Sequence, residues 1–434
     1  MTAIDPVVEV IVVEVIVDVV VIGAGFSGLA AASALRDAGY SSVVLEARDR
    51  VGGKVESSVD GLGRRFDSGG QFVADEMHEI RTLVEASGAR LVRNQAVGEA
   101  LTVPTSWHDD WDVGEAAYES MRGLSDTPAD RWFHEWIDSL PVTEGAKTAI
   151  ASTANGQMCM DHRLLGLAHA ADQLRRTPSL AEELQYTADR TMHSVAEHLA
   201  ARLDVRLGHP VRSVQVHESH VDVHTDLGSA RGRHVVVAVP PSVVQRIEFR
   251  PPLPDVLTEA AAAFRAADVT KILLRYAEPF WTAQGCNGTI RFCEPAGLYV
   301  ADASVGEAHA LVVFVGGPLA ANWRALGEDG RRAAALHHLV SVLGDAALTP
   351  LDVQVRDWPP DEWGGGGYCQ FVTGLGAPTQ IESLVGGAPG ITFAATEYAE
   401  RFPGYIEGAL HAGRRAAADA AQHLRELPSD RVDT

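Results

Sequence analysis

The chain has 434 residues, 46% of them hydrophobic, which is enough for roughly two or three domains with cores of ordinary size. Its 36 basic and 58 acidic residues give a formal net charge of −22, which disfavours nucleic acid and anionic membranes as partners. The 4 cysteines are scattered and form no CxxC pair, so the composition predicts a globular protein in a reducing, cytoplasmic setting.

The N-terminal segment is apolar, but it predicts neither a signal peptide nor a membrane span. Residues 7–22 are interrupted by Glu9, Glu14 and Asp18, no basic residues precede them, and no small-residue cleavage site follows. We therefore expect residues 15–22 to form the buried first strand. The residues before them are predicted to be either an extra edge strand or a disordered tail.

Residues 19–54 have the pattern of the first βαβ unit of a dinucleotide-binding fold. Gly23, Gly25 and Gly28 form a GxGxxG turn directly after an apolar run and before an alanine-rich helix. In such a turn the first glycine allows the tight bend, the second lets backbone approach a pyrophosphate, and the third lets the helix pack on the strand. Glu46 ends the second apolar run, where a carboxylate can accept hydrogen bonds from ribose hydroxyls.

The residues after Glu46 favour FAD over NAD. The run EARDRVGGK is similar to the continuation found in FAD-binding proteins of the glutathione-reductase-like class, whereas a nicotinamide dehydrogenase has no need of its glycine pair. A further glycine pair, Gly69 and Gly70, follows in FDSGGQF. It is either a plain loop or a second place where backbone lies against a flat ligand.

The middle of the chain changes pattern twice. Residues 78–186 predict a largely helical insertion that could roof a pocket, because no parallel-strand alternation occurs there. Strand patterns return at residues 205–239, and a helix is expected at residues 259–267. In the strand that follows, Lys271 has apolar neighbours. This position is costly unless the charge is paired or catalytic, although periodicity alone also allows the side chain to point outward.

The histidines do not predict a metal site. His217, His220 and His224 straddle a hairpin turn with no cysteine or extra carboxylate at ligand spacing, which favours a solvated hairpin face. His193 and His198 are five residues apart in a predicted helix, so they do not stack on one face, and no HExxH motif occurs. We assign no metal.

Seven motifs, in order over nearly the whole chain, resemble the flavin-containing monoamine oxidase family, which also holds L-amino-acid and polyamine oxidases. They are GAGFSGL with EARDRVGGK, FDSGGQF, HPVRSVQV, VVVAVPP, VTKILLRYAEPFW, RDWPPDEWGGGGY and FAATEYAERFPGYIEGALHAGRRAA. The resemblance implies an α/β fold in which a glutathione-reductase-like, FAD-binding Rossmann domain is built from discontinuous segments and joined to an α+β substrate-binding domain. The expected segments are 1–78, 192–260 and 362–434 for FAD, and 79–191 and 261–361 for the substrate.

The resemblance also implies roles for single residues. Lys271 matches the lysine that holds a water against flavin N5 and helps reoxidation, and Tyr368 and Tyr405 match the aromatic pair that channels the amine. The backbone of Val211 is expected at the adenine, Glu397 in the loop near the pyrophosphate, and Trp358 at the flavin edge. The full set of expected cofactor-binding residues is Gly23, Gly25, Phe26, Ser27, Gly28, Glu46, Ala47, Arg48, Gly53, Lys54, Gly69, Gly70, Gln71, Phe72, Val211, Trp358, Glu397, Tyr405 and Ile406.

Four positions depart from the family pattern. Gly367 stands where animal monoamine oxidases have the cysteine joined to the flavin, which predicts non-covalent FAD. Lys54 stands for the more usual arginine, Ala395 for a glycine and Phe402 for a tryptophan. Phe402 and the short helical insertion leave the shape of the substrate pocket open.

The sequence therefore predicts an oxidase that removes hydride from a C–H next to nitrogen, gives an imine or iminium, and is reoxidised by O2 with release of H2O2. The expected partners are O2 and a small amine or amide, without nucleic acid or membrane, and a homodimer is compatible with the sequence. No side chain stands out as a general base, which suits a reaction of the neutral amine. The candidates for gripping an amino-acid carboxylate are Arg64, Arg65, Arg291 and Arg324.

Three alternatives remain open from the sequence. The first is an antibiotic-tailoring oxidase that acts on an amine or amide nitrogen of a large intermediate, with capture of the iminium closing a ring. The second is an FAD-dependent desaturase or isomerase of a C–C bond, against which Lys271 and the two tyrosines argue. The third is a flavin-binding protein without turnover.

Overall fold

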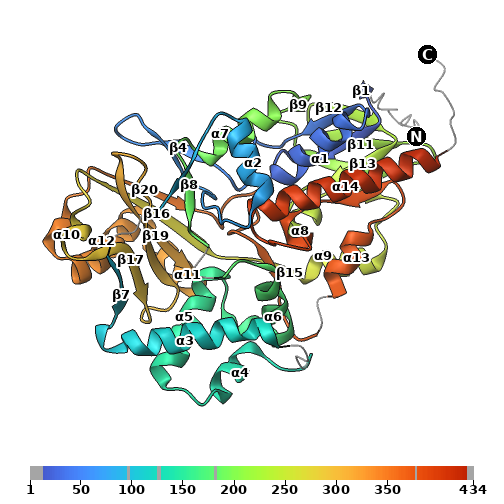
Figure 1. Cartoon of the computed structure of the whole chain (residues 1–434). Coiled ribbons are helices and arrows are strands. Elements are labelled where there is room, and N and C mark those ends of the chain that lie inside the picture. Colours follow the sequence, from blue (N-terminus) through green and yellow to red (C-terminus); the bar gives the residue numbers. More distant parts are fainter. Residues whose placement is uncertain (1–12, 95–97, 125–128, 180–182, 377–378, 428–434) are drawn as a thin grey trace, which may run out of the picture.

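The computed structural model of the chain describes residues 13–94, 98–124, 129–179, 183–376 and 379–427 (Figure 1). In this part of the chain, a five-stranded parallel sheet has the order β22-β13-β2-β3-β9. Its strands are β2 (Val19–Ile22), β3 (Ser42–Leu45), β9 (Val205–Arg206), β13 (His234–Val237) and β22 (Ile391–Phe393). The sheet thus combines three distant stretches of sequence. The central strands β2 and β13 are buried at every residue, as parallel strands covered on both faces require.

Helices α1 (Phe26–Asp37) and α14 (Ile406–Glu426) pack together on one face of this sheet (Figure 1). Their contact is close because Gly413 has no side chain: a Cβ atom added there would lie 2.1 Å from the carbonyl oxygen of Ser27. A second sheet of order β1-β12-β11-β10-β14 lies beside the parallel sheet. Its strands are β1 (Val13–Ile16), β10 (Val211–Val216), β11 (Val221–Thr225), β12 (Gly228–Gly232) and β14 (Glu248–Arg250).

The expectation of one buried strand over residues 15–22 is wrong. The segment divides at Asp18, whose carboxylate accepts hydrogen bonds from the backbone N–H of Ser41 at 2.8 Å and from its hydroxyl at 2.7 Å. Strand β2 enters the parallel sheet, whereas β1 pairs with β12 as an edge strand. Ile16 is 70% exposed, so the first part of this apolar run is not in the core.

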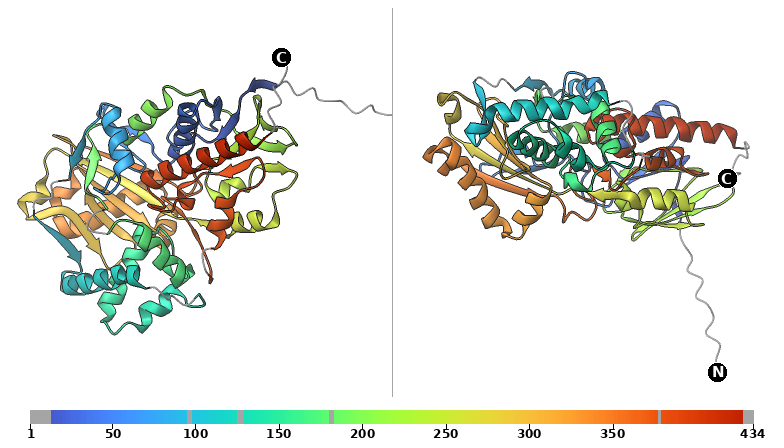
Figure 2. Two further views of the ribbon diagram at one scale, coloured as in Figure 1. Left: turned by 45° about the vertical axis from the view of Figure 1, so that its right-hand side comes forward. Right: turned by 90° about the horizontal axis from the view of Figure 1, so that it is seen from below.

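The other half of the molecule is organised by a mixed sheet of order β20-β16-β19-β18-β17-β7. Its strands are β7 (Glu99–Val103), β16 (Val269–Tyr276), β17 (Cys286–Phe292), β18 (Leu298–Asp302), β19 (His309–Gly316) and β20 (Asp352–Asp357). Helices α10 (Phe280–Ala283), α11 (Pro318–Arg324) and α12 (Gly327–Leu343) bury one face. In both views of Figure 2 this sheet lies at one end of the molecule, and α14 runs from the middle toward the opposite end.

The predicted helical insertion is present, with three strands that the sequence did not indicate. Its helices are α2 (His78–Ala86), α3 (His108–Ser120), α4 (Phe133–Ser139), α5 (Glu144–Gln157) and α6 (Leu167–Arg176). Strand β7 joins the mixed sheet, and β6 (Leu91–Arg93) pairs with β8 (Tyr186–Ala188). The remaining elements are α7 (Met192–Ala200), α8 (Pro241–Val244), α9 (Asp255–Ala263), α13 (Thr379–Gly386), β4 (Ser57–Val59), β5 (Arg65–Asp67), β15 (Phe264–Ala266) and β21 (Gln370–Val372).

The helix expected at residues 259–267 begins and ends four residues earlier, since α9 runs from Asp255 to Ala263 and β15 follows directly. In the described part of the chain, no helix is both long enough and apolar enough to cross a membrane.

Candidate active site

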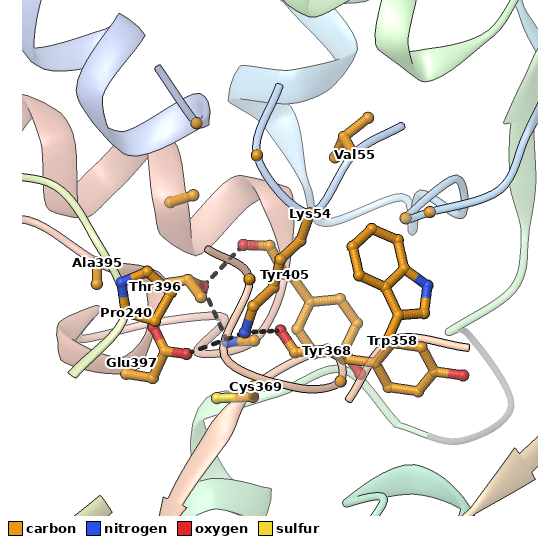
Figure 3. A pocket seen from close by; sticks show the side chains of 18 of the residues that line it. Lys54, Val55, Pro240, Trp358, Tyr368, Cys369, Ala395, Thr396, Glu397 and Tyr405 are labelled. Carbon is orange, nitrogen blue, oxygen red and sulfur yellow. Dashed lines mark hydrogen bonds and ion pairs between the residues drawn. The ribbon is translucent and has the colours of Figure 1, made fainter. Parts of the chain in front are cut away.

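A cavity of about 480 Å³ lies between the two halves and is lined by residues from both. Its walls include the turn after β2, the end of β3, the start of α14, the mixed sheet and helices α5 and α6. Figure 3 shows part of the wall: Pro240, Thr396 and Glu397 lie on one side of the view, and Trp358 and Tyr368 on the other.

The GxGxxG turn forms one end of the cavity, and its three glycines have different surroundings. Gly23 has φ +99°, and an added Cβ would lie 2.7 Å from the carbonyl oxygen of Ala238. A Cβ on Gly28 would lie 1.9 Å from the carbonyl oxygen of Gly23. At Gly25 the nearest protein atom would be Cα of Gly53, at 3.8 Å, so the open side of this glycine belongs to the cavity. These surroundings match the three roles expected of the motif: Gly23 makes the turn, Gly28 allows the helix contact, and Gly25 faces the ligand.

Glu46 is buried at the end of β3 and faces the same end of the cavity. One carboxylate oxygen accepts the backbone N–H of Ala24 at 2.7 Å, and the other accepts that of Arg48 at 2.9 Å. These bonds fix the carboxylate beside the glycine turn. Each oxygen keeps further lone pairs with which to accept hydroxyl hydrogens.

An ion pair and a helix N-terminus also bound the cavity. Lys54 Nζ lies 3.5 Å from a carboxylate oxygen of Glu397 and donates to the carbonyl oxygen of Tyr368 at 3.4 Å (Figure 3). Helix α14 begins at Ile406 with no side-chain cap, and Tyr405 is its N-cap residue. The first backbone N–H groups of this 21-residue helix therefore favour a partner with negative charge.

Lys271 is buried in β16, which decides the alternative that periodicity left open. Its ammonium donates to the carbonyl oxygens of Asp67 at 2.7 Å and Gly69 at 2.9 Å, and to the side-chain oxygen of Gln71. Burial lowers the pKa of Lys271 to about 8, against the raising effect of the Asp67 charge. Burial also raises the pKa of Asp67 to about 6, although hydrogen bonds from Met192 and His193 and the nearby Lys271 oppose the shift.

The mixed sheet forms a wall of the cavity through one row of directly opposed residues. Lys271 is paired with Phe314, Phe314 with Tyr299, and Tyr299 with Arg291, and all of them line the cavity. Neighbouring strands are about 4.8 Å apart, so the backbone of Arg291 lies about 14 Å from that of Lys271. The ring of Phe314 also contacts Tyr368 edge-on, with 6.2 Å between centroids.

Of the four arginines considered for a substrate carboxylate, Arg291 alone lines the cavity. Its guanidinium lies 3.5 Å from a carboxylate oxygen of Asp112 and 3.8 Å from one of Glu115. Arg64 is exposed, Arg65 pairs with Glu197, and Arg324 pairs with Asp268 and Asp357. Of the positions that depart from the family pattern, Phe402 packs into the core rather than lining the cavity.

The structure brings nearly all of the expected site residues to one cavity. Gly28 is the exception, since it packs the helix against the turn and does not line the wall. Lining residues that the sequence did not indicate include Gln157, Met158, Leu174, Glu183 and Tyr299. They belong to the insertion and to the mixed sheet, where no motif separates a residue facing the cavity from its neighbours.

Glu183 is the most consequential of these residues. Its carboxylate accepts the hydroxyl hydrogen of Tyr405 at 2.5 Å and an amide hydrogen of Gln157 at 3.3 Å. Burial raises the pKa of Glu183. The sequence offered no candidate base because Glu183 belongs to none of the recognised motifs.

The histidine hairpin differs from expectation in one respect. Ligand atoms of His217, His220 and Asp222 lie within 4.8 Å of one another, so a carboxylate does face the two histidines. Both oxygens of Asp222 also accept hydrogen bonds from Arg231, at 2.7 and 2.8 Å. The group lies on β11 and on the connection between β10 and β11, outside the set of cavity-lining residues.

The parallel sheet and the glycine turn with its carboxylate define a dinucleotide-binding protein, in which the mixed sheet adds a second wall to the cavity. The sequence profile of the flavin-containing amine oxidoreductases matches residues 26–185 and 154–421. The chain belongs to this family and is a flavoprotein oxidoreductase that acts on amines.

Individual relatives cover almost the full chain. An L-amino acid dehydrogenase of Synechocystis is 27% identical, over 92% of this chain and 94% of its own length. The flavin-containing amine oxidase B of Canis lupus familiaris is 28% identical, over 96% and 88%. A structure of a putrescine oxidase variant with redesigned cofactor binding superposes with a TM-score of 0.87 at 26% identity, covering 94% of this chain and 99% of that one. These likenesses confirm the predicted fold class and the predicted cofactor, FAD.

The cavity fits FAD in its own geometry. Space opens beside Gly25, where only backbone could approach a pyrophosphate, and the Glu46 carboxylate stands next to it. The uncapped start of α14 lines the same cavity, as do Tyr368, Tyr405 and Lys271.

Proposed function

We propose that the protein is an amine oxidase in which hydride leaves a C–H next to nitrogen and O2 is the electron acceptor. One observation carries the proposal: Lys271, Tyr368 and Tyr405 line the same cavity as the glycine turn and Glu46, although they come from distant parts of the chain. When bound, FAD supplies the chemistry by accepting two electrons from the substrate and passing them to O2, which leaves as H2O2.

The tyrosines hold the amine. Tyr405 and Tyr368 both line the cavity, and burial raises the pKa of each phenol, so both stay neutral. Between aromatic faces an amine is shielded from water, which disfavours its charged form. The tyrosines thereby favour the neutral amine, whose lone pair assists removal of hydride from the adjacent carbon.

Lys271 has the role of assisting reaction with O2. Its ammonium donates one hydrogen bond each to Asp67, Gly69 and Gln71, and the last two fix a segment of the cavity wall. A buried positive charge at this wall stabilises the negative charge that develops as O2 is reduced. Since all three N–H groups have protein acceptors, a water held by Lys271 would replace one of these bonds.

FAD is held without a covalent bond. Gly367, which precedes Tyr368, has no side chain to offer, and a Cβ there would lie 3.0 Å from a methyl group of Val269. The nearby thiol of Cys369 is buried, and burial raises its pKa, so it is a poor nucleophile. Precipitation with acid should release the yellow colour into the supernatant, and colour remaining in the pellet would contradict this statement.

The preferred substrate is an amine without a carboxylate. Arg291, the arginine among the four candidates that lines the cavity, already faces Asp112 and Glu115, so an incoming carboxylate would have to compete with both. The net charge of −22 also favours cations over anions near the protein surface.

A panel of benzylamine, cyclohexylamine, putrescine, spermidine, L-phenylalanine and L-lysine tests the proposal. Two readouts are required: anaerobic bleaching of the flavin and formation of H2O2 in air. We expect both with at least one amine and neither with the amino acids. Bleaching without H2O2 would indicate a dehydrogenase with another acceptor. Silence on the whole panel would overturn the proposal and favour a tailoring enzyme of larger intermediates.

A further inference from the structure

A chain of hydrogen bonds runs from the aromatic pair into the helical insertion. The hydroxyl of Tyr405 donates to Glu183 Oε1 at 2.5 Å, Gln157 Nε2 donates to Glu183 Oε2 at 3.3 Å, and the hydroxyl of Tyr118 donates to Gln157 Oε1 at 2.7 Å. The four residues come from the N-cap of α14, the segment before β8, α5 and α3. Tyr405, Glu183 and Gln157 line the cavity, whereas Tyr118 is fully buried behind them.

Glu183 carries a carboxylate that no basic side chain neutralises at close range. Among the described residues, no lysine, arginine or histidine lies within 4.0 Å of it, whereas Glu115 and Glu397, which also line the cavity, face Arg291 and Lys54. A desolvated carboxylate without a counter-charge is costly unless it is protonated or a ligand brings a cation.

The titratable and charged groups around Glu183 do not supply that cation. Tyr405 and Gln157 act on its pKa through hydrogen bonds that partly oppose the effect of burial, Glu119 raises it, and Arg122 lowers it through a weaker interaction over distance. The other groups that sense its charge are neutral at neutral pH: Tyr118, Cys159, Tyr299 and Tyr368.

An amine substrate brings both the missing cation and a proton that it must lose. Alkyl ammonium groups are protonated at neutral pH, whereas hydride removal requires the neutral amine. In water the gap of about six pKa units between an ammonium and a carboxylic acid keeps the proton on nitrogen. In a buried site both pKa values move toward each other, because burial disfavours the two charged forms together.

We propose that Glu183 accepts the proton of the substrate ammonium through the hydroxyl of Tyr405, a role that rests on the proposed amine oxidase activity. An N–H bond of the ammonium breaks as Tyr405 Oη takes up that proton, and the hydroxyl hydrogen of Tyr405 passes to Glu183 Oε1. An ammonium and a carboxylate become an amine and a carboxylic acid, so charge and protons balance without a co-reactant. The proton returns to solvent when the product leaves.

Gln157 and Tyr118 are positioning residues in this scheme. The amide of Gln157 holds the second oxygen of Glu183, and Tyr118 fixes the orientation of that amide because its hydroxyl donates to the amide oxygen. Together they leave Oε1 directed at Tyr405, which places the acceptor at hydrogen-bond distance from the relay hydroxyl.

The test is the pH dependence of anaerobic flavin reduction at saturating substrate, using whichever monoamine of the panel, benzylamine or cyclohexylamine, reduces the wild-type enzyme faster. In the wild type the rate should stay high well below the pKa of the free ammonium. In Glu183→Gln the acidic limb should move up toward that pKa, with a loss of about 100-fold at pH 7 that largely recovers at pH 10. Tyr405→Phe should show the same shift, and Glu183→Asp, which retains a carboxylate, should keep the wild-type limb.

The control is Glu144→Gln, which removes an exposed carboxylate of α5 that pairs with Lys147 and does not line the cavity. Its pH profile should match the wild type. An equal loss at every pH in Glu183→Gln would overturn the relay. A raised KM for putrescine with an unchanged monoamine pH profile would also overturn it, and would assign Glu183 to binding the distal ammonium of a diamine. If no amine reduces the wild-type flavin, the proposed function itself fails, and the relay with it.

Discussion

At the nucleotide end of the cavity the wall is largely backbone, whereas at the substrate end it consists of side chains. Gly23, Gly25 and Gly53 bring main chain to the surface of the first end, with Glu46 held by two backbone N–H groups. The second end combines Lys271, Phe314 and Tyr299 from the mixed sheet with side chains of α5, α14 and the segment before β8.

The difference determines how each end responds to substitution. A backbone wall restricts residue type, because any Cβ would collide with protein or with the ligand. A side-chain wall restricts only size and polarity at each position, so it can change with the substrate while the sheet beneath it stays the same. Substitutions at the first end should therefore be the more damaging.

The largest effect is expected from Gly28→Ala. The added methyl group would lie 1.9 Å from the carbonyl oxygen of Gly23, so α1 or the turn must move. We expect a loss of about 3 kcal/mol or more in the free energy of unfolding, as for overpacked cores, together with loss of FAD. Thermal unfolding and the ratio of flavin to protein measure the two effects.

Gly25→Ala is the matched control and sharpens the comparison. Gly25 has φ −71° and ψ 173°, which alanine adopts freely, and the nearest protein atom would be 3.8 Å away. The apoprotein should unfold within about 0.5 kcal/mol of the wild type. FAD affinity should fall about tenfold or more, the equivalent of one hydrogen bond lost to a charged phosphate. If both variants lost stability equally, the assignment of Gly25 to the ligand would be wrong.

An intermediate effect is expected from Lys271→Met, in the side-chain wall of the second end. Without the buried charge, reoxidation of the reduced flavin by O2 should slow by about 100-fold, as when one electrostatic stabiliser is removed. Rapid mixing of reduced enzyme with O2 measures the rate, and Lys147→Met, which removes a lysine paired with Glu144 outside the cavity wall, is the control. Unchanged reoxidation would refute the role.

The pH dependence of the same rate tests the charge itself. Because burial lowers the pKa of Lys271 to about 8, its ammonium loses its proton as pH rises through that value. The wild-type reoxidation rate should therefore fall above about pH 8, and Lys271→Met should show no such step. A rise in the wild-type rate over this range would indicate that the neutral amine is the active form.

The same contrast explains which parts of the fold and the site could be predicted from the sequence. The fold class and FAD could be predicted because glycine spacing and Glu46 record backbone constraints directly in residue type. Lys271 was recognisable as unusual, but its burial depended on the pairing of β16 between β19 and β20. Glu183 was not recognisable, because no local pattern shows that this glutamate meets a tyrosine 222 residues further along the chain. The division of residues 15–22 likewise depended on Ser41 binding Asp18.

The smallest effect is expected at the histidine hairpin, a third region where side chains meet away from the cavity. Both oxygens of Asp222 are occupied by Arg231, and the nearby guanidinium repels a dication at the point where a ligand carboxylate would bind it. Zinc or EDTA should therefore change the free energy of unfolding of the wild type by less than about 0.5 kcal/mol.

Arg231→Met frees the carboxylate beside His217 and His220, whose ring nitrogens each lie 3.5 Å from it. In that variant zinc at 100 times its Kd should stabilise by about 2.7 kcal/mol. Comparable stabilisation of the wild type would show that the three side chains already form a metal site, and that Arg231 yields to the ion.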